Sequence, residues 1–447
     1  MTADMLDWTN ASFAKLEMKD HEARAGELAG RMREMVADGE LPFLSMPFMD
    51  ELETQLDALG VVLERFDHML LLGIGGSALG ARALQKAFFP EQDMPGHNGP
   101  WLWIADNVDP AALNRYMEKL PPEKTVVVTI SKSGGTIETA GQYLLVKEWM
   151  RAELGDEWKE HMIFVTDEKI GFLRKEAAAE SIRALAVPDN LGGRYSVLSA
   201  VGLIPALFAG INWRELVRGA RDMAEAFVST ELDGEALSMH PAFHLAVWNA
   251  ALEDAGFDQL IFFSYIPAWA SFGDWFAQLW AESLGKEGKG TQPIPSVGVT
   301  DQHSVNQMFL DGPRNKACLF LTCPSLPEGP RFPEDADETF DYVRGKAFGE
   351  LIQAEGLGTL MALSKNDVPL VEVRMAEAQP YNAGKMIVLF GAATILTGWL
   401  MDINPLDQPA VELGKRLAKA RLGADGLAEE KADLRTFLTG DRDEREF

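Results

Sequence analysis

The residues best suited to chemistry lie in the segment 278–286, whose sequence is QLWAESLGK. Gln278 and Glu282 stand four residues apart, so a helix would place both on one face. The neighbouring Leu279 and Trp280 are apolar, and a carboxylate among them is unfavourable unless it has a task such as moving a proton. We interpret Glu282 as a candidate acid–base group, with a solvated helix face as the alternative.

A glycine-rich turn, GIGGSALG at 73–80, follows an apolar segment that ends at Leu72. Glycine lets the backbone turn tightly and bring its amides toward an anion at a helix start. The order of the glycines differs from the dinucleotide-binding fingerprint, and Asp106 lies too far along to be its acidic residue. We therefore interpret the turn as part of a phosphate site, with a dinucleotide site as the alternative.

A second turn, SKSGGT at 131–136, follows the apolar segment 126–130. It combines three hydroxyl groups, one lysine and two glycines at the expected start of a helix. This combination is suited to binding an oxyanion. The alternative is an ordinary helix cap, although a cap does not require three hydroxyls and a lysine.

Other polar candidates are scattered along the chain. His303 follows an expected strand at an expected helix start, where a neutral imidazole that exchanges protons near pH 7 is favoured. A purely structural histidine is the alternative. Arg194 follows two glycines that would let the backbone pack close to a ligand. Lys415 lies seven residues after Gln408, so one helix would place both on the same face.

Metal-dependent and nucleophilic chemistry receive little support from the motifs. His240 and His244 have the spacing of two metal ligands on a helix, but Pro241 interrupts them and no acidic residue lies between them. No nucleophile-elbow motif for a catalytic serine is present in the sequence. We predict neither a metal site nor a cofactor.

Short apolar segments alternate with helical patterns, which is typical of parallel βαβ units and an α/β fold. The expected strands of the first half are 68–74, 101–105, 125–130, 162–166 and 183–187, and those of the second half are 259–265, 294–300, 316–322 and 368–375. The uncharged stretch 386–401 is short for a membrane span, so we predict a buried helix. In such sheets ligands bind beyond the carboxyl ends of the strands, where most of the motifs lie.

Composition limits the partners. The 447 residues include 41 basic and 68 acidic side chains, a formal net charge of −27. This charge argues against nucleic acid or an anionic membrane as partner, whereas a small anionic substrate would need a locally basic pocket. The candidates for such a pocket are Lys132, Arg194, Lys286, Lys289 and Lys415. Cys318 and Cys323, the only cysteines, are expected to be buried thiols. So few cysteines, and an acidic N-terminus without a signal pattern, fit a cytoplasmic location.

Taken together, the motifs resemble the glucose-6-phosphate isomerase family in its compact bacterial form. The motifs that carry the resemblance occur in a consistent order: 73–80, 131–136, GGRYS at 192–196, 278–286, DQH at 301–303 and DQPAVELGK at 407–415. The first two are shared by sugar-isomerase domains in general, and the other four are specific to this family.

The resemblance implies an α/β fold with two sugar-isomerase (SIS) domains, each a parallel sheet flanked by helices in a flavodoxin-like three-layer arrangement. The implied domains are an N-terminal helical segment (1–45), a first SIS domain (46–212), a second SIS domain (213–404) and a C-terminal helical segment (405–447). It also implies a homodimer with shared active sites, in which the histidine comes from the partner subunit. The implied reaction is the interconversion of glucose 6-phosphate and fructose 6-phosphate.

The resemblance also implies roles for individual residues. The phosphate site would comprise Gly76, Ser77, Ser131, Lys132, Ser133 and Thr136. Glu282 would move a proton between C2 and C1 through a cis-enediol, and Arg194 would stabilise the developing negative oxygen.

The remaining implied roles concern the sugar itself. His303 and Lys415 would assist opening of the sugar ring, and Gln278 and Gln408 would bind substrate hydroxyls.

Two other classes of function remain open. One is a non-catalytic sugar-phosphate sensor, which would need none of the catalytic groups. The other is an isomerase with relaxed substrate choice that also converts mannose 6-phosphate.

Overall fold

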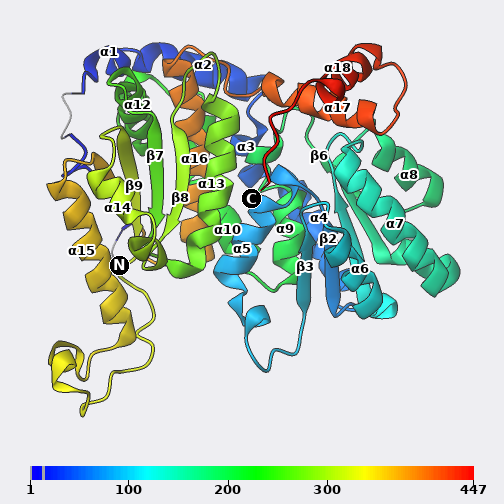
Figure 1. Ribbon diagram of the computed structural model, residues 1–447, viewed down its shortest axis with the longest axis horizontal. Helices are drawn as coiled ribbons and strands as arrows, with labels where there is room; N and C mark the ends of the chain where they lie inside the picture. The colour runs from blue at the N-terminus through cyan, green and yellow to red at the C-terminus, as the bar shows by residue number, and fades with distance from the viewer. Residues whose placement is uncertain (1–2, 13–15, 447) are drawn as a thin grey trace. The chain divides into compact units, whose positions relative to one another are not determined.

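The computed structural model describes residues 3–12 and 16–446 of the chain (Figure 1). The chain divides into two compact units, Met1–Pro405 and Leu406–Phe447. The second unit contains the 3-10 helix η10 (Pro409–Val411) and the helices α17 (Glu412–Arg421) and α18 (Ala428–Thr439). The domain boundaries expected after residues 45, 212 and 404 stay predictions.

The first unit contains two sheets, and the first sheet is entirely parallel in the order β3-β2-β4-β5-β6. Its strands are β2 (His68–Leu72), β3 (Trp101–Ala105), β4 (Thr125–Ile130), β5 (Met162–Asp167) and β6 (Arg183–Val187). Every residue of β4 and β5 is buried, as expected for central parallel strands covered on both faces. The α/β class predicted from the sequence is confirmed.

Helices cover both faces of this sheet. One face packs against α6 (Pro110–Lys119), α7 (Ile137–Leu154) and α8 (Phe172–Glu180) through an apolar cluster that includes Val127, Tyr143 and Phe164. The helices α4 (Asp50–Leu63) and α5 (Leu79–Phe88) each pack against α9 (Ala200–Phe208), and α9 also contacts β2.

The second sheet has the order β1-β10-β9-β7-β8, and its edge strand β1 runs antiparallel to β10. Its strands are β1 (Met5–Asp7), β7 (Gln259–Ser264), β8 (Gln292–Val297), β9 (Lys316–Thr322) and β10 (Leu370–Arg374). One face packs against α14 (Asn306–Asp311) and α15 (Phe348–Lys365). Phe262 of β7 contacts Phe276 of α13 (Ala270–Leu284) and Phe390 of α16 (Pro380–Leu400), so these helices pack on the sheet as well.

The helix α16 contains the uncharged stretch for which we predicted a buried helix. It is long and apolar enough to cross a membrane by length and composition, but 94% of its most apolar window is buried within the protein. It packs against α10 (Trp213–Val228) and α12 (Pro241–Asp254) as well as α13. The prediction of a buried helix is confirmed.

The connections of the first sheet locate a topological switch point. The chain leaves β2 for β3 on one side and then returns to β4 on the other side of β2. Ligands of open parallel sheets bind at the carboxyl ends of the strands that flank such a reversal. The two turns that follow β2 and β4 are the motifs at 73–80 and 131–136, so both candidate phosphate turns begin at this switch point.

Candidate functional site

The glycine-rich turn packs directly on another turn of the chain. It continues from β2 through the 3-10 helix η2 (Gly75–Ser77) into α5. A Cβ atom at Gly76 would lie 2.2 Å from the carbonyl carbon of Gly193, in the 3-10 helix η6 (Gly193–Tyr195). Gly75 has a φ of +55°, which glycine adopts without strain. The glycines therefore allow close contact between this turn and the one that carries Arg194.

The second turn brings together the three hydroxyls predicted for the phosphate site. The Ser131 hydroxyl donates to Thr136 Oγ1 at 3.3 Å, and Ser133 Oγ lies 3.4 Å from the same oxygen. Thr136 is the N-cap residue of the 18-residue helix α7, and its side chain makes no capping hydrogen bond. A cluster of hydroxyls beside a helix N-terminus is suited to an anion.

Lys132 of the same turn points elsewhere. Its ammonium group donates to the carbonyl oxygen of Asp189, in the loop that follows β6. Partial burial lowers the pKa of Lys132. The structure thus brings the hydroxyls of the turn together but holds the lysine against a backbone carbonyl.

The helix α13 presents the carboxylate identified from the sequence. Gln278 Nε2 donates to Glu282 Oε1 at 2.9 Å, so the two side chains share a face as predicted. A Cβ atom at Gly75 would lie 3.0 Å from Gln278 Nε2, which places this amide over the glycine turn. Gln278 Oε1 is buried and has no hydrogen-bond partner in the described residues, so it can accept a hydrogen bond from a ligand hydroxyl.

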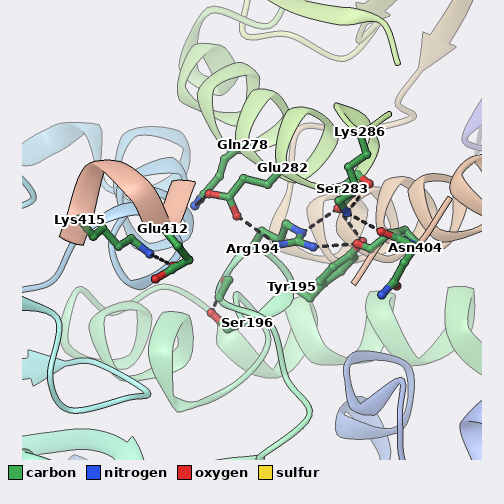
Figure 2. Close-up of polar contacts among 12 residues, drawn as sticks. Arg194, Tyr195, Ser196, Gln278, Glu282, Ser283, Lys286, Asn404, Glu412 and Lys415 are labelled. Atoms are coloured by element: carbon green, nitrogen blue, oxygen red, sulfur yellow. Dashed lines mark hydrogen bonds and ion pairs between the residues drawn. The ribbon is translucent and has the colours of Figure 1, made fainter. Parts of the chain in front are cut away.

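Arg194 connects the η6 turn to α13. The residue is only 2% exposed. Its Nη1 group donates to Glu282 Oε2 at 3.2 Å, its Nε to Ser283 Oγ at 2.7 Å and its Nη2 to the Pro405 carbonyl at 2.7 Å. Figure 2 shows the guanidinium between Glu282 on one side and Ser283 on the other. The structure therefore assembles Gln278, Glu282 and Arg194 beside the glycine turn.

His303 is the last residue of the 3-10 helix η8 (Thr300–His303), so its expected position at a helix start is wrong. Its side chain is exposed and makes no hydrogen bond or ion pair within residues 3–12 and 16–446. The structure does not bring it to Glu282.

Gln408 and Lys415 belong to the second unit. Lys415 Nζ donates to Glu412 Oε1 at 2.7 Å within α17, and this hydrogen bond lowers the pKa of Glu412. Gln408 precedes Pro409 and has a non-helical backbone, with φ −157° and ψ 68°, and α17 begins only at Glu412. The predicted common helix face of Gln408 and Lys415 is therefore wrong: residues before a proline are disfavoured in helical conformation.

Sequence reasoning named Lys286 as a candidate for a basic pocket but did not relate Tyr195 or Ser283 to Arg194. The hydroxyl of Tyr195 lies 2.9 Å from Ser283 Oγ, and the Lys286 ammonium donates to the carbonyls of Ser283 and Asn404. The pairs Tyr195–Ser283 and Lys286–Asn404 are 88 and 118 residues apart, so no local pattern relates them. The available signals were that Tyr195 directly follows Arg194 and that Ser283 directly follows the predicted base.

Two sheets of parallel strands, the second with the antiparallel edge strand β1, and turns of this kind at the switch point of the first sheet are typical of proteins built from sugar-isomerase domains. A glucose-6-phosphate isomerase from Chlamydia trachomatis has the same fold, with a TM-score of 0.70 and 20% identity over 94% of this chain and 81% of that one. A hypothetical protein from Thermus thermophilus matches with a TM-score of 0.83 and 31% identity, over 94% of this chain and 100% of that one.

Sequence relatives narrow the class. A glucose-6-phosphate isomerase from Carboxydothermus hydrogenoformans is 36% identical over 90% of this chain and 89% of its own length. A glucose-6-phosphate isomerase from Thermus thermophilus is 35% identical over 80% of this chain and 84% of its own length. The family model for phosphoglucose isomerase matches residues 48–323. The chain belongs to the phosphoglucose isomerase family.

His240, considered above as a metal ligand, instead caps a helix. Its Nδ1 accepts a hydrogen bond from the Ala242 amide at the start of α12, at 3.2 Å, and its ring packs against Phe227. Burial lowers the pKa of His240 to about 4. The imidazole is therefore neutral in the folded protein at pH 7.

We predict that this histidine makes the protein acid-sensitive. The folded pKa is lower than the unfolded value of about 6.5, so the unfolded state takes up the proton first and stability falls between pH 6.5 and 4. At pH 5 the free energy of unfolding should be about 2 kcal/mol lower than at pH 7 because of this group. The variant His240→Asn keeps a capping side chain but cannot titrate. Its free energy of unfolding, measured with urea, should therefore fall by about 2 kcal/mol less between pH 7 and pH 5 than that of the wild type. An unchanged pH dependence would contradict the assignment.

Proposed function

We propose that the chain catalyses the reversible isomerisation of glucose 6-phosphate and fructose 6-phosphate, through ring opening and a cis-enediolate intermediate. The observation that carries the proposal is the pairing of Glu282 with Arg194 at 3.2 Å beside the glycine turn. The Glu282 side chain is 34% exposed, so it remains accessible to a substrate, whereas that of Arg194 is 1% exposed. A movable proton acceptor and a fixed positive charge are the two groups that enediolate chemistry requires.

This geometry suggests separate roles for Glu282, Arg194 and Gln278 in the reaction. Glu282 removes a proton from one carbon of the open-chain sugar and returns it to the neighbouring carbon, while the hydroxyl proton passes from one of the two oxygens to the other, so that the carbonyl group moves by one carbon. Arg194 stabilises the negative oxygen that develops while the proton is on Glu282, because a guanidinium stays charged throughout. Gln278, with its buried and unpartnered carbonyl oxygen, binds a substrate hydroxyl.

The substrate phosphate binds at the switch point of the first sheet in this proposal. Gly76 and Ser77 of one turn and Ser131, Ser133 and Thr136 of the other supply amides and hydroxyls at the starts of α5 and α7. Lys132 contributes its charge from the edge of this site. Such a local site accommodates a dianion in a protein whose net charge is −27.

His303 supports a dimeric enzyme in this proposal. Its exposed side chain, which has no partner in the described part of the chain, is available to the active site of a second copy. There it assists ring opening, together with Lys415, while Gln408 binds a hydroxyl of the sugar. The homodimer acts in the cytoplasm, in glycolysis and gluconeogenesis, without nucleic acid or membrane partners.

We predict complementation between two inactive variants. Each proposed site combines Glu282 of one subunit with His303 of the other. In a hybrid dimer of Glu282→Gln and His303→Ala subunits, one active site therefore lacks both Glu282 and His303, and the other retains both. Random reassociation after mild denaturation of an equal mixture should restore roughly a quarter of the wild-type rate. Each variant carried alone through the same procedure serves as the control. If the mixture stays as inactive as the parents, His303 does not serve the partner's site.

We predict robust conversion of fructose 6-phosphate to glucose 6-phosphate by the purified protein in the presence of a chelator, because the proposed chemistry requires no metal. Glu282→Gln should lower kcat by roughly 10²–10⁴-fold while the substrate still binds. The matched control is Glu118→Gln on the exposed surface of α6, which should leave kcat unchanged. A near-wild-type rate in Glu282→Gln would remove the proposed mechanism, and binding without turnover by the wild type would favour a sensor.

A further inference from the structure

Ser283 lies where three segments of the first unit meet. They are the last turn of α13, the η6 turn and the backbone at Asn404–Pro405. The Ser283 residue is completely buried. Its hydroxyl oxygen accepts from Arg194 Nε at 2.7 Å and lies 2.9 Å from the Tyr195 hydroxyl. A buried serine that accepts a hydrogen bond from a buried guanidinium is seldom an incidental feature, because losing the acceptor would leave a charged donor unsatisfied.

The acceptors around Arg194 differ in charge. Nε and Nη2 donate to neutral oxygens, the Ser283 hydroxyl and the Pro405 carbonyl, and Nη1 donates to the Glu282 carboxylate. These two neutral acceptors fix the plane of the guanidinium without themselves adding a negative charge beside it. Since a guanidinium is a rigid planar fork, fixing two of its edges also fixes the direction of Nη1. Nη1 is thus directed at the carboxylate of the proposed base.

Ser283 is itself held in place. The Tyr195 ring packs against Phe43 with a centroid distance of 4.9 Å, and burial raises the pKa of Tyr195, so its hydroxyl keeps its proton. The carbonyl of Ser283 accepts from Lys286 Nζ at 2.9 Å, and the same ammonium also donates to the Asn404 carbonyl. The Arg194 guanidinium and the Lys286 ammonium thus both lie at the C-terminal end of α13, where the helix dipole favours positive charge (Figure 2).

We propose that Ser283 is a positioning residue that orients the Arg194 guanidinium toward the enediolate oxygen, and so acts on catalysis through Arg194 alone. The inference rests on the proposed isomerase function. It goes beyond that function by assigning a role to a side chain that does not touch the substrate.

A double-mutant cycle tests this role, with kcat and KM for fructose 6-phosphate measured in each protein. Ser283→Ala should lower kcat about 10- to 100-fold, because a misdirected guanidinium loses transition-state contacts, and leave KM within about threefold. Arg194→Lys removes the planar fork that Ser283 holds. In the Arg194→Lys protein, the further change Ser283→Ala should lower kcat less than about twofold, since the two residues act as a unit.

The matched control is Ser296→Ala in β8, which removes a buried hydroxyl that has no hydrogen-bond partner in the described residues and should leave kcat unchanged. If Ser283→Ala fails to fold, Ser283→Cys keeps the side-chain shape with a weaker acceptor, and should lose about tenfold in kcat with the same non-additivity. Equal losses in both backgrounds, or a wild-type kcat in Ser283→Ala, would overturn the inference alone. An inactive wild type would overturn the proposed function and this inference together.

Discussion

A single buried guanidinium joins the parts of the first unit that the proposed chemistry requires. Arg194 enters from a turn beyond the first sheet and is bound by the helix α13, which packs on the second sheet. Removing a charge of this kind from water is costly, and only complete hydrogen bonding and a nearby opposite charge offset that cost. Ser283, Glu282 and the Pro405 carbonyl each contribute a hydrogen bond to this requirement, so their positions relative to the η6 turn are tightly constrained.

Close backbone contact makes this arrangement possible. The glycine turn after β2 and the turn that carries Arg194 approach so closely that a Cβ at Gly76 would overlap Gly193. The same turn begins at the switch point of the first sheet, where the hydroxyls of the second turn also gather. The position of the proposed phosphate site and the position of the guanidinium therefore have one structural origin, the pair of turns at the carboxyl edge of the sheet.

Much of the fold was predictable from local patterns. The strands 101–105, 125–130, 183–187 and 316–322 have the predicted bounds, because each is a short, largely apolar segment between helical patterns. The strand β1 was missed, since three residues are too few to show a period. The shared face of Gln278 and Glu282 was also predictable, because both lie on one helix.

The contacts between distant segments were not predictable. Neither the partner of Lys132, a carbonyl beyond β6, nor the Tyr195–Ser283 contact leaves a local pattern, because both are set by tertiary packing. Helix-face reasoning failed for Gln408, where Pro409 delays the helix. The roles of His303, Lys415 and Gln408 in the reaction stay predictions.

The central claim is that Glu282 carries a proton between adjacent carbons of the sugar while Arg194 stabilises the enediolate. Isomerisation of fructose 6-phosphate in D₂O, followed by NMR, tests it most directly, because a proton held on a carboxylate can exchange with solvent. We expect deuterium at C2 in a fraction of the glucose 6-phosphate formed. In Glu282→Gln the rate of deuterium incorporation should fall in parallel with the rate of turnover. Turnover at the wild-type rate with no deuterium at C2, or exchange that persists unchanged in Glu282→Gln, would contradict it.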